Sequence, residues 1–146
     1  MQITLTQEQY GKLLELVYLG NWMVNSYRGD ERTEEYDRTA EHILSFAPSA
    51  GCQDRIEFDE FEGRYFPSRK LDEDLKPVVD EYDDDVFWNA LIDRLAERDL
   101  VRARGEEVVD KMEWEEYSRN LEPHLKKYEK EIDESGVEHL EIFKIS

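Results

Sequence analysis

Residues 6 to 27, TQEQYGKLLELVYLGNWMVNSY, contain the longest apolar and helix-forming run of this chain. Thr6 is a favourable helix N-cap, and Gln9 three residues later completes a capping box. A helix is therefore predicted from about Gln7 to about Tyr27. Apolar side chains occupy more than one face of it, which is typical of a helix that is central in a core or shared with another subunit. We favour the central position.

Four further segments have the periodicity or the composition of helices. Pro77 is tolerated in the first turn of a helix but interrupts a helix interior, so the region around it is predicted as a separate short helix. A kink is expected at Pro123 for the same reason. The predicted segments are 34–46, 73–82, 84–99 and 107–134.

Both ends of the chain carry short alternating segments, QITL at 2–5 and VEHLEIFKI at 137–145. A lone strand leaves its backbone groups unpaired, so we expect these two segments to pair with each other. RIEFDEF at 55–61 also alternates, as an exposed short strand or an extended loop would. The predicted fold is α+β and predominantly α-helical, with four or five helices and a small sheet formed by the N- and C-terminal strands. A single domain over 1–146 is expected from the length.

The charge of the chain limits its partners. There are 37 acidic residues against 19 Lys and Arg, which gives a formal net charge of −18. Such a charge opposes binding to nucleic acid and to anionic lipid, because both are polyanions, and it favours a basic protein partner. The most apolar window, 13–24, is too short and too polar to span a bilayer. Cys52 is the single cysteine, which fits a reducing cytoplasm.

Three consecutive aspartates, Asp83 to Asp85, lie within EYDDDVFWNALIDRL at 81–95. Carboxylates at a helix N-terminus are stabilised by the helix dipole and cap free amide groups, so the cluster favours a helix start. A calcium loop needs glycine at its sixth position, where Asp85 stands if the loop begins at Asp80. The other interpretations are a Mg²⁺ site completed by a phosphate ligand and an acidic patch that faces a partner.

Patterns typical of catalysis are absent from the sequence. The three histidines lack the spacing of a zinc helix or of a di-iron bundle, and Cys52 has no activating neighbours in its local sequence. The glycines are too scattered for a phosphate-binding loop, and no nucleophile elbow occurs. We therefore expect a protein without a resident metal or cofactor, and we favour a binding module over an enzyme.

The segment EGRYFPSRKL, 62–71, gathers cations beside aromatic residues, a composition found at binding hot spots. Arginine can also make paired hydrogen bonds to phosphate or carboxylate. In the other interpretation the aromatics enter the core and the bases neutralise nearby acids. Asn21 and Asn25 flank Trp22 and would form either a buried hydrogen-bond network or one wall of a pocket. The candidate contact residues are Trp22, Arg64, Tyr65, Phe66, Arg69 and Lys70.

These patterns favour a non-catalytic, acidic protein-interaction or accessory module that binds a basic protein. The alternative is a small metal-dependent enzyme or ligand-binding protein that uses the cluster Asp83–Asp85. The surplus of apolar residues on the first helix also favours a homodimer.

Overall fold

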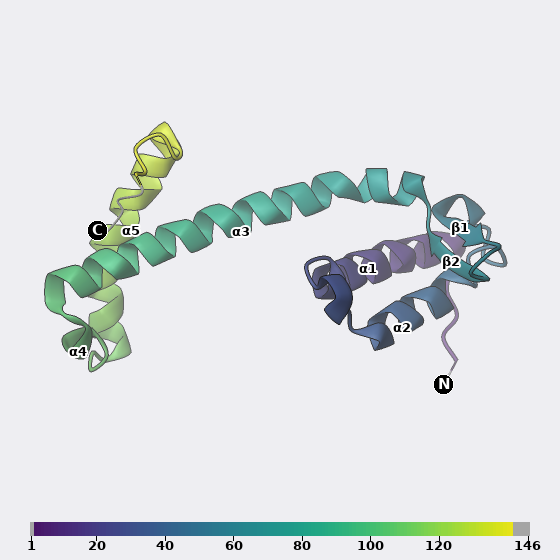
Figure 1. The fold of residues 1–146 in the computed structure, drawn as a ribbon, viewed down its shortest axis with the longest axis horizontal. Coiled ribbons are helices and arrows are strands. Elements are labelled where there is room, and N and C mark those ends of the chain that lie inside the picture. The colour runs from purple at the N-terminus through teal and green to yellow at the C-terminus, as the bar shows by residue number, and fades with distance from the viewer. Residues whose placement is uncertain (1, 142–146) are drawn as a thin grey trace. The chain divides into compact units, whose positions relative to one another are not determined.

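The computed structural model describes residues 2–141 (Figure 1). Within them the chain forms five α-helices and one two-stranded antiparallel sheet, which confirms the prediction of a predominantly helical fold with a small sheet. The chain divides into two compact units, Met1–Glu81 and Tyr82–Ser146. That both units belong to one domain stays a prediction. No helix of the described part is both long and apolar enough to cross a membrane.

Helix α1, Gln7–Asn25, begins at the predicted capping box. The Gln9 amide donates to Thr6 Oγ1 at 3.2 Å, and the Thr6 amide donates to Gln9 Oε1 at 3.0 Å. The helix is not central in the core as we had favoured. Leu14 is fully buried, whereas Leu16 remains 67% exposed, because α1 packs along one face against α2.

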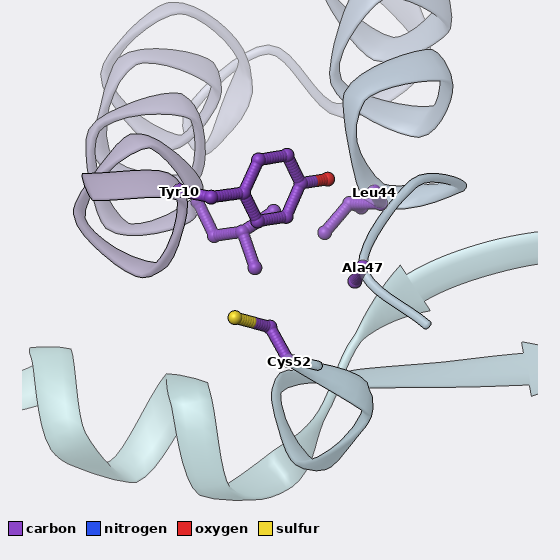
Figure 2. Close-up of a cluster of buried hydrophobic side chains, with 5 residues drawn as sticks. Tyr10, Leu44, Ala47 and Cys52 are labelled. Atoms are coloured by element: carbon purple, nitrogen blue, oxygen red, sulfur yellow. The ribbon is translucent and has the colours of Figure 1, made fainter. Parts of the chain in front are cut away.

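Helix α2, Glu34–Leu44, lies beside α1 and closes the core of the first unit (Figure 1). Buried side chains from both helices and from the following loop meet in one cluster, with the Cys52 sulfur directed into it (Figure 2). The cysteine therefore packs as a small apolar side chain. The cluster consists of Tyr10, Leu14, Leu44, Ala47 and Cys52.

The sheet is a hairpin of β1, Ile56–Asp59, and β2, Arg64–Pro67. The expectation that the terminal segments form the sheet is wrong for residues 2–5, which are not in a strand, and residues 142–146 lie outside the described part. A hairpin joins its strands through a short loop, whereas pairing the two ends of the chain requires closing a very long one. The hairpin packs against α2.

Helix α3, Arg69–Arg104, replaces the two helices predicted around Asp83 with one helix of 36 residues. Pro77 lies inside this helix and removes one backbone hydrogen bond. Leu71 and Leu75, six and two residues before Pro77, are only 0% and 6% exposed, and they pack that part of the helix against the rest of the first unit. Their burial offsets the cost of the proline, which is about 3 kcal/mol.

The second unit contains the C-terminal part of α3, the short helix α4, Glu106–Val109, and α5, Trp114–Ser135. Gly105, with a φ of +86°, directly follows α3, which continues five residues beyond the predicted end at 99. The long helix predicted over 107–134 is divided into α4 and α5. Pro123 lies within α5. Ala96, Leu100 and Tyr128 form the buried part of this unit.

Candidate functional site

A pocket of about 360 Å³ lies between α1, α2 and β2 in the first unit. Its volume is within the range of sites that hold small ligands or single side chains. Four of the six predicted contact residues line it, namely Trp22, Arg64, Tyr65 and Phe66. The full lining is Val17, Tyr18, Asn21, Trp22, Ser26, Arg32, Asp37, Ala40, Glu41, Leu44, Arg64, Tyr65, Phe66 and Pro67.

The spacing of the lining residues along α1 and α2 places them on the faces of these helices that border the pocket. Asp37, Ala40, Glu41 and Leu44 of α2 are three or four positions apart and therefore share one face of that helix. On α1, Val17 and Asn21 are related in the same way, as are Tyr18 and Trp22. The third wall is β2, residues Arg64–Pro67.

The β2 wall combines one partly buried and one exposed aromatic ring. Tyr65 packs against the core cluster, and its ring centroid is 4.8 Å from that of Phe58. Phe66 is 37% exposed and is therefore accessible to a binding partner. One aromatic of the segment 62–71 therefore packs against the core while the other faces solvent and the pocket, and contact with a partner through this segment stays a prediction.

A hydrogen-bond network around Asn25 forms the polar side of the site. Asn25 is 1% exposed, and its Nδ2 donates to Asn21 Oδ1 at 2.9 Å and to the Thr33 carbonyl at 3.3 Å. Its Oδ1 accepts from the Thr33 amide at 2.8 Å. Asn21 in turn lines the pocket. Both asparagines therefore belong to one hydrogen-bond network, and Asn21 also forms part of the pocket wall.

Asp37 is the acceptor at the centre of this network. Arg32 donates to it twice, from Nη2 to Oδ1 at 2.6 Å and from Nε to Oδ2 at 3.0 Å. Asn21 Nδ2 donates to the same Oδ1 at 2.9 Å. The hydrogen bonds from Arg32, more than any other contact, lower the pKa of Asp37 below its ordinary value. Asp37 is thus an ionised structural acceptor.

Arg64 lies at the pocket rim with mixed contacts. Its Nε donates to Glu41 Oε2 at 2.9 Å, and its guanidinium carbon lies 5.8 Å from the centroid of the Phe66 ring. The side chain is 42% exposed, and a guanidinium carries five N–H donors. Arg64 can therefore donate to a carbonyl or carboxylate of a bound partner while it keeps its contact with Glu41.

Arg69 and Lys70, the two remaining predicted contact residues, are not in the pocket. They lie in the first turn of α3, where Arg69 donates to Glu73 at 2.7 Å and Lys70 to Asp54 at 2.6 Å. For these two residues the structure agrees with the interpretation that the bases neutralise nearby acids.

The pKa of one further tyrosine of the pocket, Tyr18, is raised by burial and by a neighbouring carboxylate. Tyr18 donates its hydroxyl hydrogen bond to Asp72, and burial followed by this hydrogen bond raises the pKa of Tyr18 to about 12. The phenol therefore stays protonated at neutral pH and acts as a donor. It ties α1 to the first turn of α3, which holds one wall of the pocket in position.

The aspartate cluster does not begin a helix, so that interpretation is wrong. Asp83, Asp84 and Asp85 lie in the interior of α3 and are exposed to solvent. Asp84 Oδ1 accepts from Trp88 Nε1 at 2.9 Å, one turn further along the helix. Among residues 2–141, no group of three or more His, Cys, Asp and Glu side chains is placed to hold a metal ion.

The histidines do not join the pocket. His42 is exposed on α2 and meets the ring of Phe46 edge-on with centroids 5.0 Å apart, while His139 contacts Glu131 at 2.5 Å. The pocket therefore contains aromatic rings, amides and paired charges, a composition suited to binding.

Sequence reasoning missed several lining residues, of which Arg32, Asp37 and Glu41 carry charge. Asp37 and Glu41 are one helical turn apart beside the apolar positions of α2, so periodicity could have found them. Arg32 lies in a turn, and nothing in its local sequence indicated its role.

No protein-family model matches the chain, and neither does any curated protein or solved structure. The chemistry of the pocket is therefore the basis for a function.

Proposed function

We propose that this protein is a non-catalytic interaction module that binds a basic protein partner. The pocket between α1, α2 and β2 receives an apolar side chain of that partner. Trp22 and Phe66 contact the side chain, and Arg64 donates a hydrogen bond to the partner backbone beside it. The observation that carries this proposal is the convergence of Trp22 with Arg64–Phe66 in one cavity of about 360 Å³.

The composition of the pocket supports binding of a protein. Tryptophan, tyrosine and arginine are the residues most enriched at binding hot spots, and they act from partly enclosed positions that exclude water. The pocket has these residue types above an apolar floor of Ala40 and Leu44. A leucine-sized or phenylalanine-sized side chain matches the volume and the lining.

The charge of the chain supports a basic partner. A net charge of −18 attracts cations over distances set by the Debye length, about 10 Å at 0.1 M salt. Such steering raises the association rate at low ionic strength and weakens as salt is added. Binding should therefore decrease with salt, although the apolar contact in the pocket itself does not depend on charge.

The polar groups of the pocket support binding over catalysis. A general acid or base must be free to exchange a proton with the bound molecule. Asp37 accepts from Arg32 and from two asparagine amides, and Glu41 accepts from Arg64. These carboxylates hold the walls of the pocket together.

Occupation of the pocket can be measured by fluorescence. The chain has three tryptophans, so the double variant Trp88→Phe and Trp114→Phe leaves Trp22 as the single reporter. Short peptides with one apolar residue between lysines serve as the probe. We expect a saturable change in Trp22 emission that weakens with salt, and no change for a matched peptide with serine in place of the apolar residue.

The same hairpin provides a matched pair of variants for partner capture. Phe66→Ala removes a pocket ring, whereas Phe61→Ala removes a ring that is 99% exposed and lies outside the pocket lining. A partner held as proposed is lost with Phe66→Ala and retained with Phe61→Ala. Equal retention by both variants, together with unchanged Trp22 emission for every peptide, would reject the pocket as the binding site.

The metal-dependent alternative is tested by melting temperature. A cation that binds the folded chain through Asp83–Asp85 must raise the melting temperature. The comparison adds Mg²⁺, Mn²⁺, Ca²⁺ or Zn²⁺ at constant ionic strength. Replacing all three aspartates with asparagine provides the control, since only a specific site loses its response to the cation in that variant.

A further inference from the structure

From Leu16 onward, the outward face of α1 is apolar and uncharged. Leu16 is 67% exposed and Met23 is 52% exposed, and Tyr27, just beyond the end of the helix, is 72% exposed. The stretch from Leu16 to Tyr27 contains no Asp, Glu, Lys or Arg, although 38% of the whole chain consists of these residues. This is an extended apolar surface on a highly charged molecule.

These residues lie on one stripe of the helix. Positions 16, 20 and 23 are four and three residues apart, which places them above one another on the same face. Leu14 and Asn25, which are 0% and 1% exposed, point to the opposite side, toward α2 and the pocket. We call Leu16, Gly20 and Met23 the outer stripe of α1. It shares no residue with the pocket lining.

Gly20 lies at the middle of the outer stripe, and no contact within the described part of the first unit requires a glycine at this position. Glycine inside a helix is less stable than alanine, so an unforced glycine is a cost to the fold. A Cβ added to Gly20 would meet no other atom of the described residues within 4 Å, apart from its own helix backbone and chain neighbours. A missing Cβ at this position does allow another backbone to approach closely.

We propose that a second copy of this chain docks its own α1 on the outer stripe. The two helices run antiparallel across a two-fold axis near Gly20, so that Leu16 of one protomer contacts the partner's Met23. Such an arrangement is self-complementary, because each contact occurs twice. The spacing of the stripe, with one large apolar residue on each side of Gly20, fits this symmetry.

Charge favours a second copy on this surface. Two chains of −18 repel each other, and the repulsion is smallest where the facing surfaces carry no charge. A basic partner gains little from a neutral stripe, since its attraction depends on facing carboxylates. The outer stripe thus suits a copy of the same chain, whereas the acidic surface elsewhere suits a basic partner.

The salt dependence separates this dimer from binding of the basic partner. Stable interfaces bury roughly 1,200–2,000 Å² in total, and a stripe on one helix is smaller than that, so the dimer is weak and depends on concentration. Added salt screens the repulsion between the two acidic chains and strengthens the dimer. Partner binding is expected to weaken under the same conditions.

Analytical ultracentrifugation of the full chain, over a wide range of concentration at low and high salt, tests the proposal. We expect reversible dimerisation that increases with salt. Met23→Glu adds a charge to a half-exposed position, so the fold is retained and the dimer is lost. A wild-type chain that stays monomeric at every concentration, or a dimer that survives Met23→Glu unchanged, would overturn the proposal.

Two glycine variants give a matched comparison. Gly20→Ala adds a methyl group at the proposed contact and should weaken the dimer by roughly tenfold, while raising the melting temperature of the monomer. Gly11→Ala makes the same chemical change in the same helix, about two and a half turns earlier and hence on the other side. Its added Cβ also meets no other described atom within 4 Å.

Gly11→Ala should raise the melting temperature and leave dimerisation unchanged. Equal effects of the two glycine variants on dimerisation would contradict the proposed packing at Gly20. Met23→Glu should leave capture of a basic partner through the pocket intact, so failure of the dimer and failure of the proposed function give different results.

Discussion

Replacing Asn25 with aspartate tests the network behind the pocket. The exchange keeps the shape of the side chain but puts an oxygen where Nδ2 now stands. That atom faces three oxygen acceptors, Asn21 Oδ1 at 2.9 Å, the Thr33 carbonyl at 3.3 Å and Asp37 Oδ1 at 3.3 Å. Three favourable contacts would become repulsive, so Asn25→Asp should destabilise the first unit strongly.

The size of the effect is set by the cheaper of two states of the new carboxyl group in the folded chain, ionised beside Asp37 or protonated. Two unit charges 3.3 Å apart repel by about 5 kcal/mol at an effective dielectric constant near 20. Protonating the new carboxyl at pH 7 costs about 4 kcal/mol, since its unfolded pKa is about 3.9 and each unit is worth about 1.4 kcal/mol. The cheaper route sets the electrostatic cost at about 4 kcal/mol, and the lost hydrogen bonds add about 1–2 kcal/mol, so we expect a loss of about 5–6 kcal/mol at pH 7.

The loss depends on pH with a definite sign. Because the pKa of the new carboxyl is higher in the folded than in the unfolded chain, the folded variant binds more protons. Its stability is greatest below the unfolded value of about 3.9 and falls as pH rises toward the folded pKa. The penalty relative to the wild type should therefore shrink to about 2–3 kcal/mol near pH 4.5, where protonation costs only about 1 kcal/mol and the lost hydrogen bonds account for the rest.

Urea unfolding at the two pH values measures this penalty, with the emission of Trp22 as reporter in the background that lacks the other two tryptophans. Asn25→Ala is the control, because it removes the same hydrogen bonds without adding a charge, so its penalty should be similar at both values. An equal penalty for Asn25→Asp at both values, or a loss below about 1 kcal/mol at pH 7, would refute the reasoning.

Three other substitutions have expected outcomes. Leu71→Ala leaves a cavity at a fully buried position at the start of α3 and should lower the free energy of unfolding, measured with urea, by about 2–5 kcal/mol. A smaller loss would mean that neighbouring side chains move in to fill the cavity. Gly51→Ala should lower the free energy of unfolding by about 1–3 kcal/mol, because φ is +74° and the new Cβ would stand 2.8 Å from Gln7 Nε2. An unchanged melting temperature would contradict this. Asp99→Asn should cost about 1–3 kcal/mol at pH 7. Burial opposes ionisation of Asp99, but hydrogen bonds led by that from Tyr128 outweigh it and lower its pKa. The difference in free energy of unfolding between Asp99→Asn and the wild type should be complete above pH about 4 and disappear as pH falls. A difference that persists in acid would argue against an ionised Asp99.

Local patterns predicted much of the secondary structure. The capping box at Thr6 and Gln9 marked the start of α1, because both of its hydrogen bonds form within four residues. The long helix through Pro77 was missed, because the burial of Leu71 and Leu75 that offsets the proline cannot be read from their neighbours in sequence.

Composition and short-range order in this chain were enough to predict a helical fold with a small sheet and to select Trp22 and Arg64–Phe66 as candidate contact residues. The packing of α1, α2 and β2 was needed to bring those two segments together, to add Arg32, Asp37 and Glu41, and to leave Arg69 and Lys70 outside. The physical reason is distance along the chain. A cap or a helical stripe forms between neighbours in sequence, whereas the pocket joins residues more than forty positions apart, whose approach depends on which apolar faces are buried together.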